Sequence, residues 1–372
     1  MWVSLASLVL ASVVACPAAA QSPPAGSPEP GGSPGPRAIA MGMTIQAARS
    51  QAAYDAVVEE LGHAPALWSF WADWGDLDEA GCAGPRTTPL PDPALLAHMR
   101  EQGTVPLIIW QPVDSTRQDE PLYTYEKIAA GDFDCYLRSF AEGVAAIEGP
   151  VLLRFAHEFD GYWFPWGMGR FTNTPETFVA AWQHIWELMK GDQAPDASAI
   201  PGASPEPDAS PSAAVAPNAR FVWSPLGCDC PDEMLAMFPG EGYVDYLGLT
   251  AFNWAGFHKD RKGDPVRWQR LAEIVARRLG GFEDLPPIPV ILTEIGSNHR
   301  GGNKAAWITN GYNALYRRFP EVVAVMYFDV DMTTLDDPAH PETWLLTLPR
   351  DGSALEAYKA LLERPEFQGR IE

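Results

Sequence analysis

The stretch PVLLRFAHEFDGYWFPWG, residues 150–167, decides the fold. It opens with the apolar run Val151–Leu153, which is typical of a buried strand, and soon reaches His157 and Glu158. A loop rich in aromatic side chains follows the carboxylate: Tyr162, Trp163, Phe164 and Trp166. Flat aromatic rings pack well on the C–H faces of sugar rings, so a strand that ends in this way indicates a carbohydrate site.

A second stretch, PVILTEIG at residues 289–296, repeats the arrangement, because its apolar run ends in Glu294. Cleavage of a glycosidic bond commonly needs two carboxyl groups, one that protonates the leaving oxygen and one that attacks or activates water. A single glutamate after a strand is more often a solvated or ion-paired residue. Two of them, one beside a histidine and an aromatic loop, predict that Glu158 and Glu294 are a catalytic pair.

Apolar runs alternate with helical patterns along the rest of the chain, including a helix expected over Val266–Leu279 and a weak one over Asp232–Met237. Eight short apolar segments are expected to be strands: Ala38–Ile45, Ala66–Trp71, Val105–Trp110, Val151–Phe155, Arg220–Ser224, Val244–Ala251, Ile288–Thr293 and Val322–Phe328. We predict an α/β protein with a single catalytic domain, residues 37–372, that forms a (β/α)8 TIM barrel. The alternative is a doubly wound open sheet, but no Gly-rich phosphate-binding turn follows the first strand.

The barrel prediction places all strand ends, and with them the active site, at one face. Tryptophan and polar residues recur at these ends: Trp71, Asp73, Trp74, Trp110, Gln111, Phe252, Asn253, Trp254, Tyr327, Asp329 and Asp331. Core packing alone would not sort residues in this way. We therefore expect substrate contacts from the following residues: Trp71, Trp110, Arg154, His157, Trp163, Trp166, Asn253, Trp254 and Tyr327.

The composition limits the class of partner. The 372 residues include 48 acidic and 26 basic side chains, for a formal net charge of −22. Such a charge disfavours nucleic acid and anionic membrane surfaces, and it is compatible with a neutral polysaccharide. Chemistry by two carboxyl groups needs no cofactor, and no loop has a recognisable calcium-ligand spacing. We expect a β-linked polysaccharide as the partner, no cofactor, no metal, and a monomer.

The N-terminal residues 1–20 are predicted to be an export signal, although no basic residue precedes the apolar segment Trp2–Val14. One cleavage pattern is Ala18–Ala20 before Gln21. The other resembles a bacterial lipobox with Cys16 lipidated, and it is slightly favoured because Cys16 is the odd cysteine out. We expect a secreted protein or a surface-anchored bacterial lipoprotein whose lipid would anchor it to a membrane. No later apolar run is long enough to span a bilayer.

Two low-complexity segments interrupt the pattern. Residues 21–36 are predicted to be a disordered Pro/Gly/Ser linker, and residues 191–218 an exposed inserted loop. Four cysteines remain after export: Cys82, Cys135, Cys228 and Cys230. A Cys228–Cys230 bridge would be strained, so we expect Cys82 or Cys135 to pair with the other or with one of the CxC cysteines. A zinc site at this CxC is the weaker alternative.

The stretch RFAHEFDGYWFPWG resembles the acid/base motif of glycoside hydrolase family 26, and it is matched here by Arg154, His157, Glu158, Trp163 and Pro165–Gly167. Further matches follow in the order of the family: LGHAPALWSFWADWGD at 61–76, PLIIWQP at 106–112, FVWSP at 221–225, FPGEGYVDYLGLTAFNW at 238–254 and PVILTEIGS at 289–297. The resemblance covers roughly residues 39–331.

This resemblance implies a retaining, endo-acting enzyme that cleaves β-linked polysaccharides, most often mannans. Glu158 would be the general acid/base and Glu294 the nucleophile. His157 and Arg154 would order the site, and Trp163 would stack on a sugar near the cleavage point. Glu294 must stay ionised, and Arg154 is a candidate neighbour to keep it so. The acid/base needs a raised pKa, which desolvation by the aromatic residues around Glu158 would provide.

Three positions depart from the family pattern. Asp160 stands where asparagine is usual. Phe252 stands where the sixth strand commonly ends in a tyrosine that hydrogen-bonds the nucleophile, a bond that phenylalanine cannot make. Tyr327 or Phe328 stands where a tryptophan often floors the sugar site. These departures leave two alternatives open, a β-1,3-1,4-glucanase or related endoglucanase, and a non-catalytic carbohydrate-binding barrel.

Overall fold

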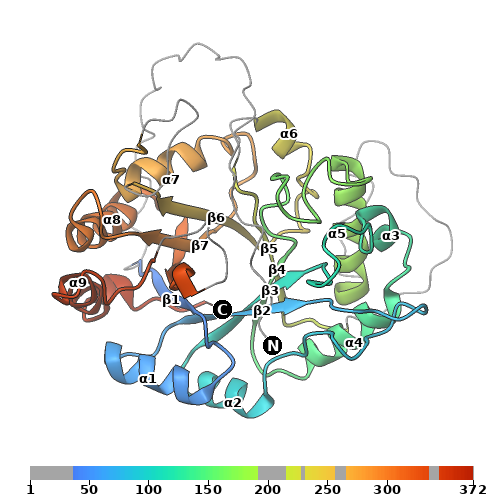
Figure 1. Ribbon diagram of the computed structural model, residues 1–372, viewed down its shortest axis with the longest axis horizontal. Coiled ribbons are helices and arrows are strands. Elements are labelled where there is room, and N and C mark those ends of the chain that lie inside the picture. Colours follow the sequence, from blue (N-terminus) through green and yellow to red (C-terminus); the bar gives the residue numbers. More distant parts are fainter. Residues whose placement is uncertain (1–36, 192–214, 228–230, 256–264, 335–342, 372) are drawn as a thin grey trace.

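The computed structural model describes residues 37–191, 215–227, 231–255, 265–334 and 343–371. In these residues eight parallel strands close into a barrel in chain order, with β8 paired to β1 (Figure 1). The strands are β1 Ala40–Ile45, β2 Leu67–Asp73, β3 Val105–Gln111, β4 Val151–Phe155, β5 Ala219–Trp223, β6 Tyr246–Asn253, β7 Val290–Ser297 and β8 Val322–Asp329. The predicted (β/α)8 barrel is confirmed.

Helices surround the strands, as Figure 1 shows. They are α1 Gln51–Leu61, α2 Pro93–Glu101, α3 Tyr125–Ala129, α4 Asp134–Ala145, α5 Pro175–Lys190, α6 Pro231–Leu235, α7 Leu271–Leu279, α8 Lys304–Arg318 and α9 Ser353–Leu362, with short 3-10 turns η3 Met332–Thr334 and η4 Pro365–Phe367. The helix α5 begins at Pro175 because the Thr174 side chain accepts the backbone N–H of Thr177 and proline is favoured in the first turn.

The helix expected over Val266–Leu279 begins five residues later than predicted. Asn253, at the end of β6, explains the difference, because its Oδ1 accepts the backbone N–H of Gln269 at 3.1 Å. The segment before Leu271 is thus bound to the end of β6 in a non-helical conformation.

Two hydrophobic layers follow from the alternation of side chains along each strand. One layer fills the barrel interior and includes Leu67, Leu107, Leu152, Val222, Ile291 and Met326. The other layer, the outer core, lies between the strands and the helices. On β4 it takes Leu153 and Phe155, whereas Leu152 and Arg154 lie on the inner face. The C-terminal end of the barrel, which we call its mouth, is lined by the inward-pointing side chains at the ends of the strands.

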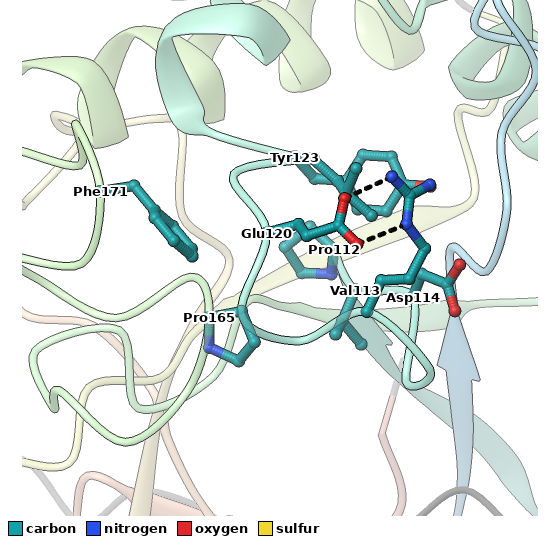
Figure 2. Close-up of a pocket in the computed structure, with 9 residues that line it drawn as sticks. Pro112, Val113, Asp114, Glu120, Tyr123, Pro165 and Phe171 are labelled. Atoms are coloured by element: carbon teal, nitrogen blue, oxygen red, sulfur yellow. Dashed lines mark hydrogen bonds and ion pairs between the residues drawn. The ribbon is translucent and has the colours of Figure 1, made fainter.

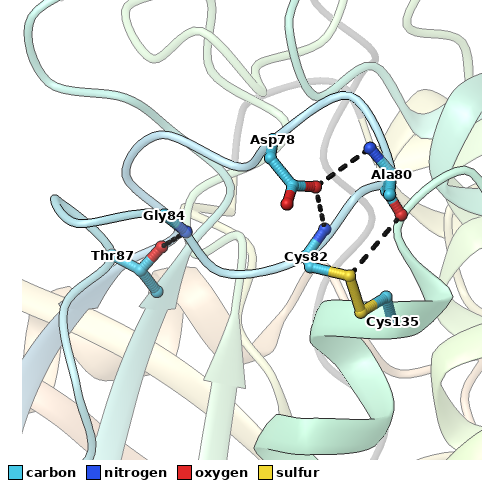
Figure 3. The surroundings of a disulfide bond; sticks show 6 residues. All are labelled: Asp78, Ala80, Cys82, Gly84, Thr87 and Cys135. Carbon is cyan, nitrogen blue, oxygen red and sulfur yellow. Dashed lines mark hydrogen bonds between the residues drawn. A yellow bond between two sulfur atoms is a disulfide. The ribbon is translucent and has the colours of Figure 1, made fainter.

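A disulfide joins Cys82, in the loop after β2, to Cys135 in α4 (Figure 3). This is one of the pairings that the sequence left open. Asp78 shapes the loop, because its Oδ1 accepts the backbone N–H groups of Ala80 and Cys82 at 2.9 Å each. Cys228 and Cys230 lie outside the described residues, so their pairing stays a prediction.

The expected export signal, the linker 21–36 and residues 192–214 of the inserted loop also lie outside the described residues. Among the residues that the structure does describe, no helix combines the length and apolar character needed to cross a membrane.

Candidate active site

A β-bulge in β7 determines that Glu294, the candidate catalytic residue of this strand, points into the barrel. Consecutive residues of β6 pair with Leu292 and then with Glu294, so Thr293 is an extra residue on β7. The alternation of faces therefore shifts by one position at Thr293. Leu292 and Ile295 both pack in the outer core, and Glu294 points inward. Without the bulge, the side chains of β7 would alternate strictly between the two faces, and Glu294 would point outward toward the helices.

Arg154, on the inner face of β4, meets Glu294 across the barrel. Its Nη1 lies 2.9 Å from Glu294 Oε1, and its Nε donates to Ser224 Oγ at 2.9 Å. The Arg154 side chain is 0% exposed. Its Nη2 is buried without a hydrogen-bond partner among the described residues. The guanidinium therefore holds the carboxylate of Glu294 in place and keeps a donor that no described protein group uses.

Glu158 follows β4 in a tight, left-handed backbone segment. Ala156 has φ 45° and Glu158 has φ 53°, values that side-chain-bearing residues rarely adopt. The backbone N–H of Glu158 donates to the carbonyl of Ser224 at 2.7 Å, which ties the segment to the end of β5. Non-glycine residues in this conformation cluster at functional sites, where the surrounding structure enforces them.

The two glutamates are in different electrostatic environments. The Glu158 carboxyl is buried, and burial raises its pKa to about 7, with the charges of Glu294 and Asp160 adding to the rise and those of Arg154 and Arg278 opposing it. Its Oε2 has no hydrogen-bond partner among the described residues. Glu294 instead is ion-paired. One carboxyl is thus suited to carry a proton, and the other to act as an anion.

His157 is buried beside Glu158, and burial together with the charge of Arg154 keeps its pKa well below the ordinary value. It is therefore neutral and lies against Phe164 and Trp166, with ring centroids 4.8 and 5.5 Å away. Trp166 donates its Nε1–H to the His157 carbonyl at 2.8 Å and stacks on Phe164. These contacts fold the aromatic loop onto the site, and Trp166 is almost completely buried.

Trp163 is partly exposed on the same loop and packs edge-on against the exposed ring of Tyr162. Its close neighbour Gly161 has no space for a Cβ atom, which would lie 2.4 Å from the Trp163 ring. The Nε1 of Trp163 is buried without a hydrogen-bond partner among the described residues. The ring therefore packs directly on Gly161, a contact that only glycine allows.

Aromatic rings from three strands gather on one side of the mouth. Phe252 of β6 lies 5.4 Å from Phe328 of β8, and Phe328 lies 6.4 Å from Trp71 of β2. Trp254 and Trp344 pack against Phe252 at 5.4 and 4.8 Å. Trp71 and Trp254 are partly exposed, as a platform for a sugar requires. We call these five residues the aromatic wall.

Comparison with known proteins places this geometry in context. No protein-family model matches the chain. Endoglucanase H of Acetivibrio thermocellus is 27% identical over 237 residues, which cover 62% of this chain and 22% of that protein. A β-1,3-xylanase of Alcaligenes sp is 23% identical over 147 residues, which cover 39% and 25%. The match thus spans a quarter or less of these relatives.

Solved structures match over nearly the whole chain. A glycoside hydrolase family 26 β-mannanase of Bacteroides ovatus has a TM-score of 0.58 at 15% identity, over 90% of each chain. A Bacillus subtilis mannanase has a TM-score of 0.54 at 17% identity, over 91% of this chain and 89% of its own. The chain has the fold of glycoside hydrolase family 26. The resemblance that the sequence motifs predicted is confirmed.

Three of the predicted substrate contacts lie outside the mouth of this barrel. Trp110 is 0% exposed and stacks on Phe140 of α4 at 4.2 Å, because it falls on the outer face of β3. Tyr327 is also on an outer face, and its hydroxyl donates to the Trp344 carbonyl at 2.8 Å. Asn253 is fully buried and caps the segment before α7. The expectation that these three side chains contact substrate is wrong, because they belong to the packing around the site.

Other residues of the candidate site were missed by sequence reasoning. Ser224, which orients Arg154, looked like an ordinary strand end. Trp344 lies far beyond the last strand, and only its residue type could have signalled a role. Asp160 was noted only as a departure from the family pattern, but its carboxylate accepts the backbone N–H groups of Leu226 and Gly227 at 2.6 and 3.0 Å. It therefore fixes the loop after β5.

A small pocket lies beside the site, between the loops that follow β3 and β4 (Figure 2). Figure 2 shows Phe171 and Pro165 on one side of it, and Tyr123 and Glu120 on the other. Its lining includes neither glutamate of the catalytic pair. Among the described residues, no group of three or more His, Cys, Asp or Glu side chains is arranged to hold a metal ion.

Proposed function

We propose that the protein is a retaining, endo-acting glycoside hydrolase that cleaves β-1,4-linked mannan-type polysaccharides. The observation that carries this proposal is the pairing of a buried Glu158, whose pKa is about 7, with a Glu294 carboxylate held by Arg154. These are the two states that double displacement needs in its first step. The mannanase names of the structural neighbours support the choice of substrate.

In the first step, Glu158 donates its proton to the glycosidic oxygen while Glu294 attacks the anomeric carbon and the leaving sugar departs. The negative charge of Glu294 is consumed as the covalent glycosyl-enzyme forms, which lowers the pKa of Glu158 by removing a like charge. Glu158 is then suited to take a proton from the water that hydrolyses the intermediate. The buried, unused Nη2 donor of Arg154 is placed to bind a substrate oxygen beside the nucleophile.

A second candidate is a β-1,3-1,4-glucanase or related endoglucanase. The sequence match to endoglucanase H supports it, since gluco- and manno-configured sugars differ only at C2. A non-catalytic sugar-binding barrel is the third candidate. Phe252 supports it, because phenylalanine cannot hydrogen-bond the nucleophile as the family's usual tyrosine does. The retention of both carboxyl groups with distinct environments argues against it.

We further propose that the protein is exported, either freely or with a lipid on Cys16. The N-terminal apolar segment is the basis of this proposal. The Cys82–Cys135 disulfide supports it, because such bonds persist mainly in oxidising compartments.

The decisive experiment measures reducing-sugar release from galactomannan, glucomannan and mixed-linkage β-glucan, with the Glu294→Ala variant as control. Release from the mannans that disappears in the variant supports the mannanase, and release confined to β-glucan supports the second candidate. Proton NMR of the first product then reports retention or inversion at the anomeric carbon. Inversion would overturn the double-displacement mechanism.

A further inference from the structure

One buried carboxylate in the barrel makes no side-chain hydrogen bond within the described part of the chain. Asp73 is the last residue of β2, which continues two residues beyond the strand end that the sequence predicts. Its side chain lies on the inner face, in the same alternation as Leu67, Ser69 and Trp71. Asp73 is 3% exposed, and neither carboxylate oxygen has a hydrogen-bond partner among the described residues.

The charged groups around Asp73 are committed to other partners. Arg49 donates to the Trp71 carbonyl at 2.8 Å, and Arg86 pairs with Asp114 at 2.6 Å. Burial and the charge of Asp114 raise the pKa of Asp73 to about 7, and Arg49 opposes this rise only in part. A buried polar group without a partner destabilises the folded state, so its presence calls for an explanation outside the fold.

Another aspartate at a strand end has different contacts. Asp329, at the end of β8, is half-buried on the outer side, and its Oδ1 accepts the backbone N–H of Leu346 at 2.6 Å. Asp160 likewise accepts backbone N–H groups. Asp73 has no such anchoring contact among the residues described. This comparison indicates that the carboxylate oxygens of Asp73 accept hydrogen bonds from a ligand and not from the protein.

The neighbours of Asp73 indicate which ligand. Trp71, two residues earlier on the same face, belongs to the aromatic wall. Gln111, the register partner of Asp73 on β3, adds an amide that both donates and accepts. An apolar ring beside paired acceptors fits a pyranose, which packs a C–H face on the ring and directs hydroxyl donors from its edge.

We propose that Asp73 is a substrate-binding residue whose carboxyl group accepts hydrogen bonds from hydroxyl groups of a sugar unit packed on Trp71. This inference rests on the proposed function and deepens it. It assigns to the β2–β3 side of the mouth the recognition of a sugar, while Glu158 and Glu294 perform the chemistry. Asp73 takes no part in bond cleavage, so its loss should weaken binding more than turnover.

The test compares Asp73→Asn and Asp73→Ala with the parent, on the polysaccharide that the parent hydrolyses best. The loss of a hydrogen-bond partner in a buried site corresponds to about a tenfold change in affinity, so we expect KM to rise by about that factor in both variants, with a much smaller change in kcat. The melting temperature of Asp73→Asn should stay the same or rise, because the carboxyl group that it replaces has no hydrogen-bond partner to lose among the described residues. Asp284→Asn, at an exposed aspartate, is the matched control.

Binding is measured independently by titration calorimetry of a short oligomer of the same polysaccharide, in the Glu294→Ala background with and without Asp73→Asn. The expected result is about a tenfold weaker affinity in the double variant. Equal KM and equal affinity in an active enzyme would overturn this inference alone. A fall in kcat with unchanged KM, or a lower melting temperature, would assign Asp73 a structural role and also overturn it. A parent that hydrolyses none of the polysaccharides would overturn the proposed function itself.

Discussion

Arg154 Nη1 lies 2.9 Å from Glu294 Oε1, and the two side chains are 0% and 10% exposed. An ion pair so well shielded interacts strongly, because little water screens it. The neighbouring Glu158 has burial and like charge raising its pKa. One cation therefore separates the roles of two chemically identical side chains, and the contact joins β4 to β7 across the barrel.

Replacement of the two glutamates should have different consequences. Glu294→Ala should lower kcat by about 10⁴-fold or more on every substrate, as loss of a nucleophile does. Glu158→Ala should lower it by about 10²- to 10⁴-fold on polysaccharides, the usual contribution of a general acid. Activity of Glu158→Ala on aryl glycosides with good leaving groups should be largely spared in the first step. Steady-state kinetics on both substrate classes measures this, and parent-like activity of either variant on polysaccharide would refute the assignment.

Arg154→Met should reduce both activity and stability. The change leaves the buried Glu294 charge unpaired, which costs about 3–5 kcal/mol in proteins where one partner of such a pair is removed. Urea unfolding measures the loss, and Arg138→Met, at an exposed arginine of α4, is the control. Arg154→Lys keeps the charge and should recover part of the stability. An Arg154→Met protein as stable as the parent would show that the ion pair has little energetic weight.

The activity should fall as the pH rises through about 7, because Glu158 must be protonated in the first step and its pKa is about 7. Asp160→Asn removes a negative charge that raises this pKa, so the basic limb of the kcat/KM profile should move to lower pH. The amide introduced by this substitution keeps an oxygen that can accept one of the two backbone N–H groups. If Asp160→Asn left the pH profile unchanged, the basic limb would not report the ionisation of Glu158.

Glu158 should also make stability depend on pH. Its pKa rises from the ordinary value of 4.5 to about 7 in the folded protein, so the folded state holds the proton more tightly than the unfolded chain does. This contribution to the free energy of unfolding is complete below about pH 4.5 and is lost as the pH rises through about 7. Urea unfolding of the parent and of Glu158→Gln between about pH 4 and 8 tests this, and parallel curves would contradict it.

The double variant Cys82→Ser, Cys135→Ser should unfold more easily. The disulfide closes a sequence separation of 53 residues, and restraints of this size contribute about 2–4 kcal/mol to the free energy of unfolding. Chemical unfolding of the oxidised parent and of the variant measures the difference. The reduced parent should behave like the variant. If the reduced and oxidised parents were equally stable, the disulfide would contribute nothing to the free energy of unfolding.

The barrel could be predicted from sequence because each strand is a short apolar run, and because Glu158 and Glu294 follow such runs. The face on which a strand-end residue lies could not be read in the same way. Trp110 and Trp71 have the same residue type and a similar place in the pattern, yet one packs against α4 and the other belongs to the aromatic wall. A shift of one residue in register decides between them.

The left-handed backbone at Ala156 and Glu158 was equally hidden, since glycine is the usual marker of that conformation and neither residue is glycine. Such conformations are enforced by tertiary contacts, here the bond from the Glu158 N–H to the Ser224 carbonyl. The pairing of Arg154 with Glu294 was within reach of sequence reasoning, which named Arg154 as a candidate neighbour of this glutamate, and the 2.9 Å contact agrees with it.

Because β7 has one extra residue, it can lose a residue and keep its pairing. The strand β4, which carries Arg154, has no bulge and cannot. Leu292 and Glu294 already pair with consecutive residues of β6, so deletion of Thr293 would leave a regular strand with Glu294 still directed inward. Deletion of Leu153 from β4 would instead turn Arg154 toward the outer core, because nothing there absorbs the lost residue. A one-residue deletion in β4 would therefore break the ion pair by turning Arg154 away, whereas loss of Thr293 from β7 would leave Glu294 in position.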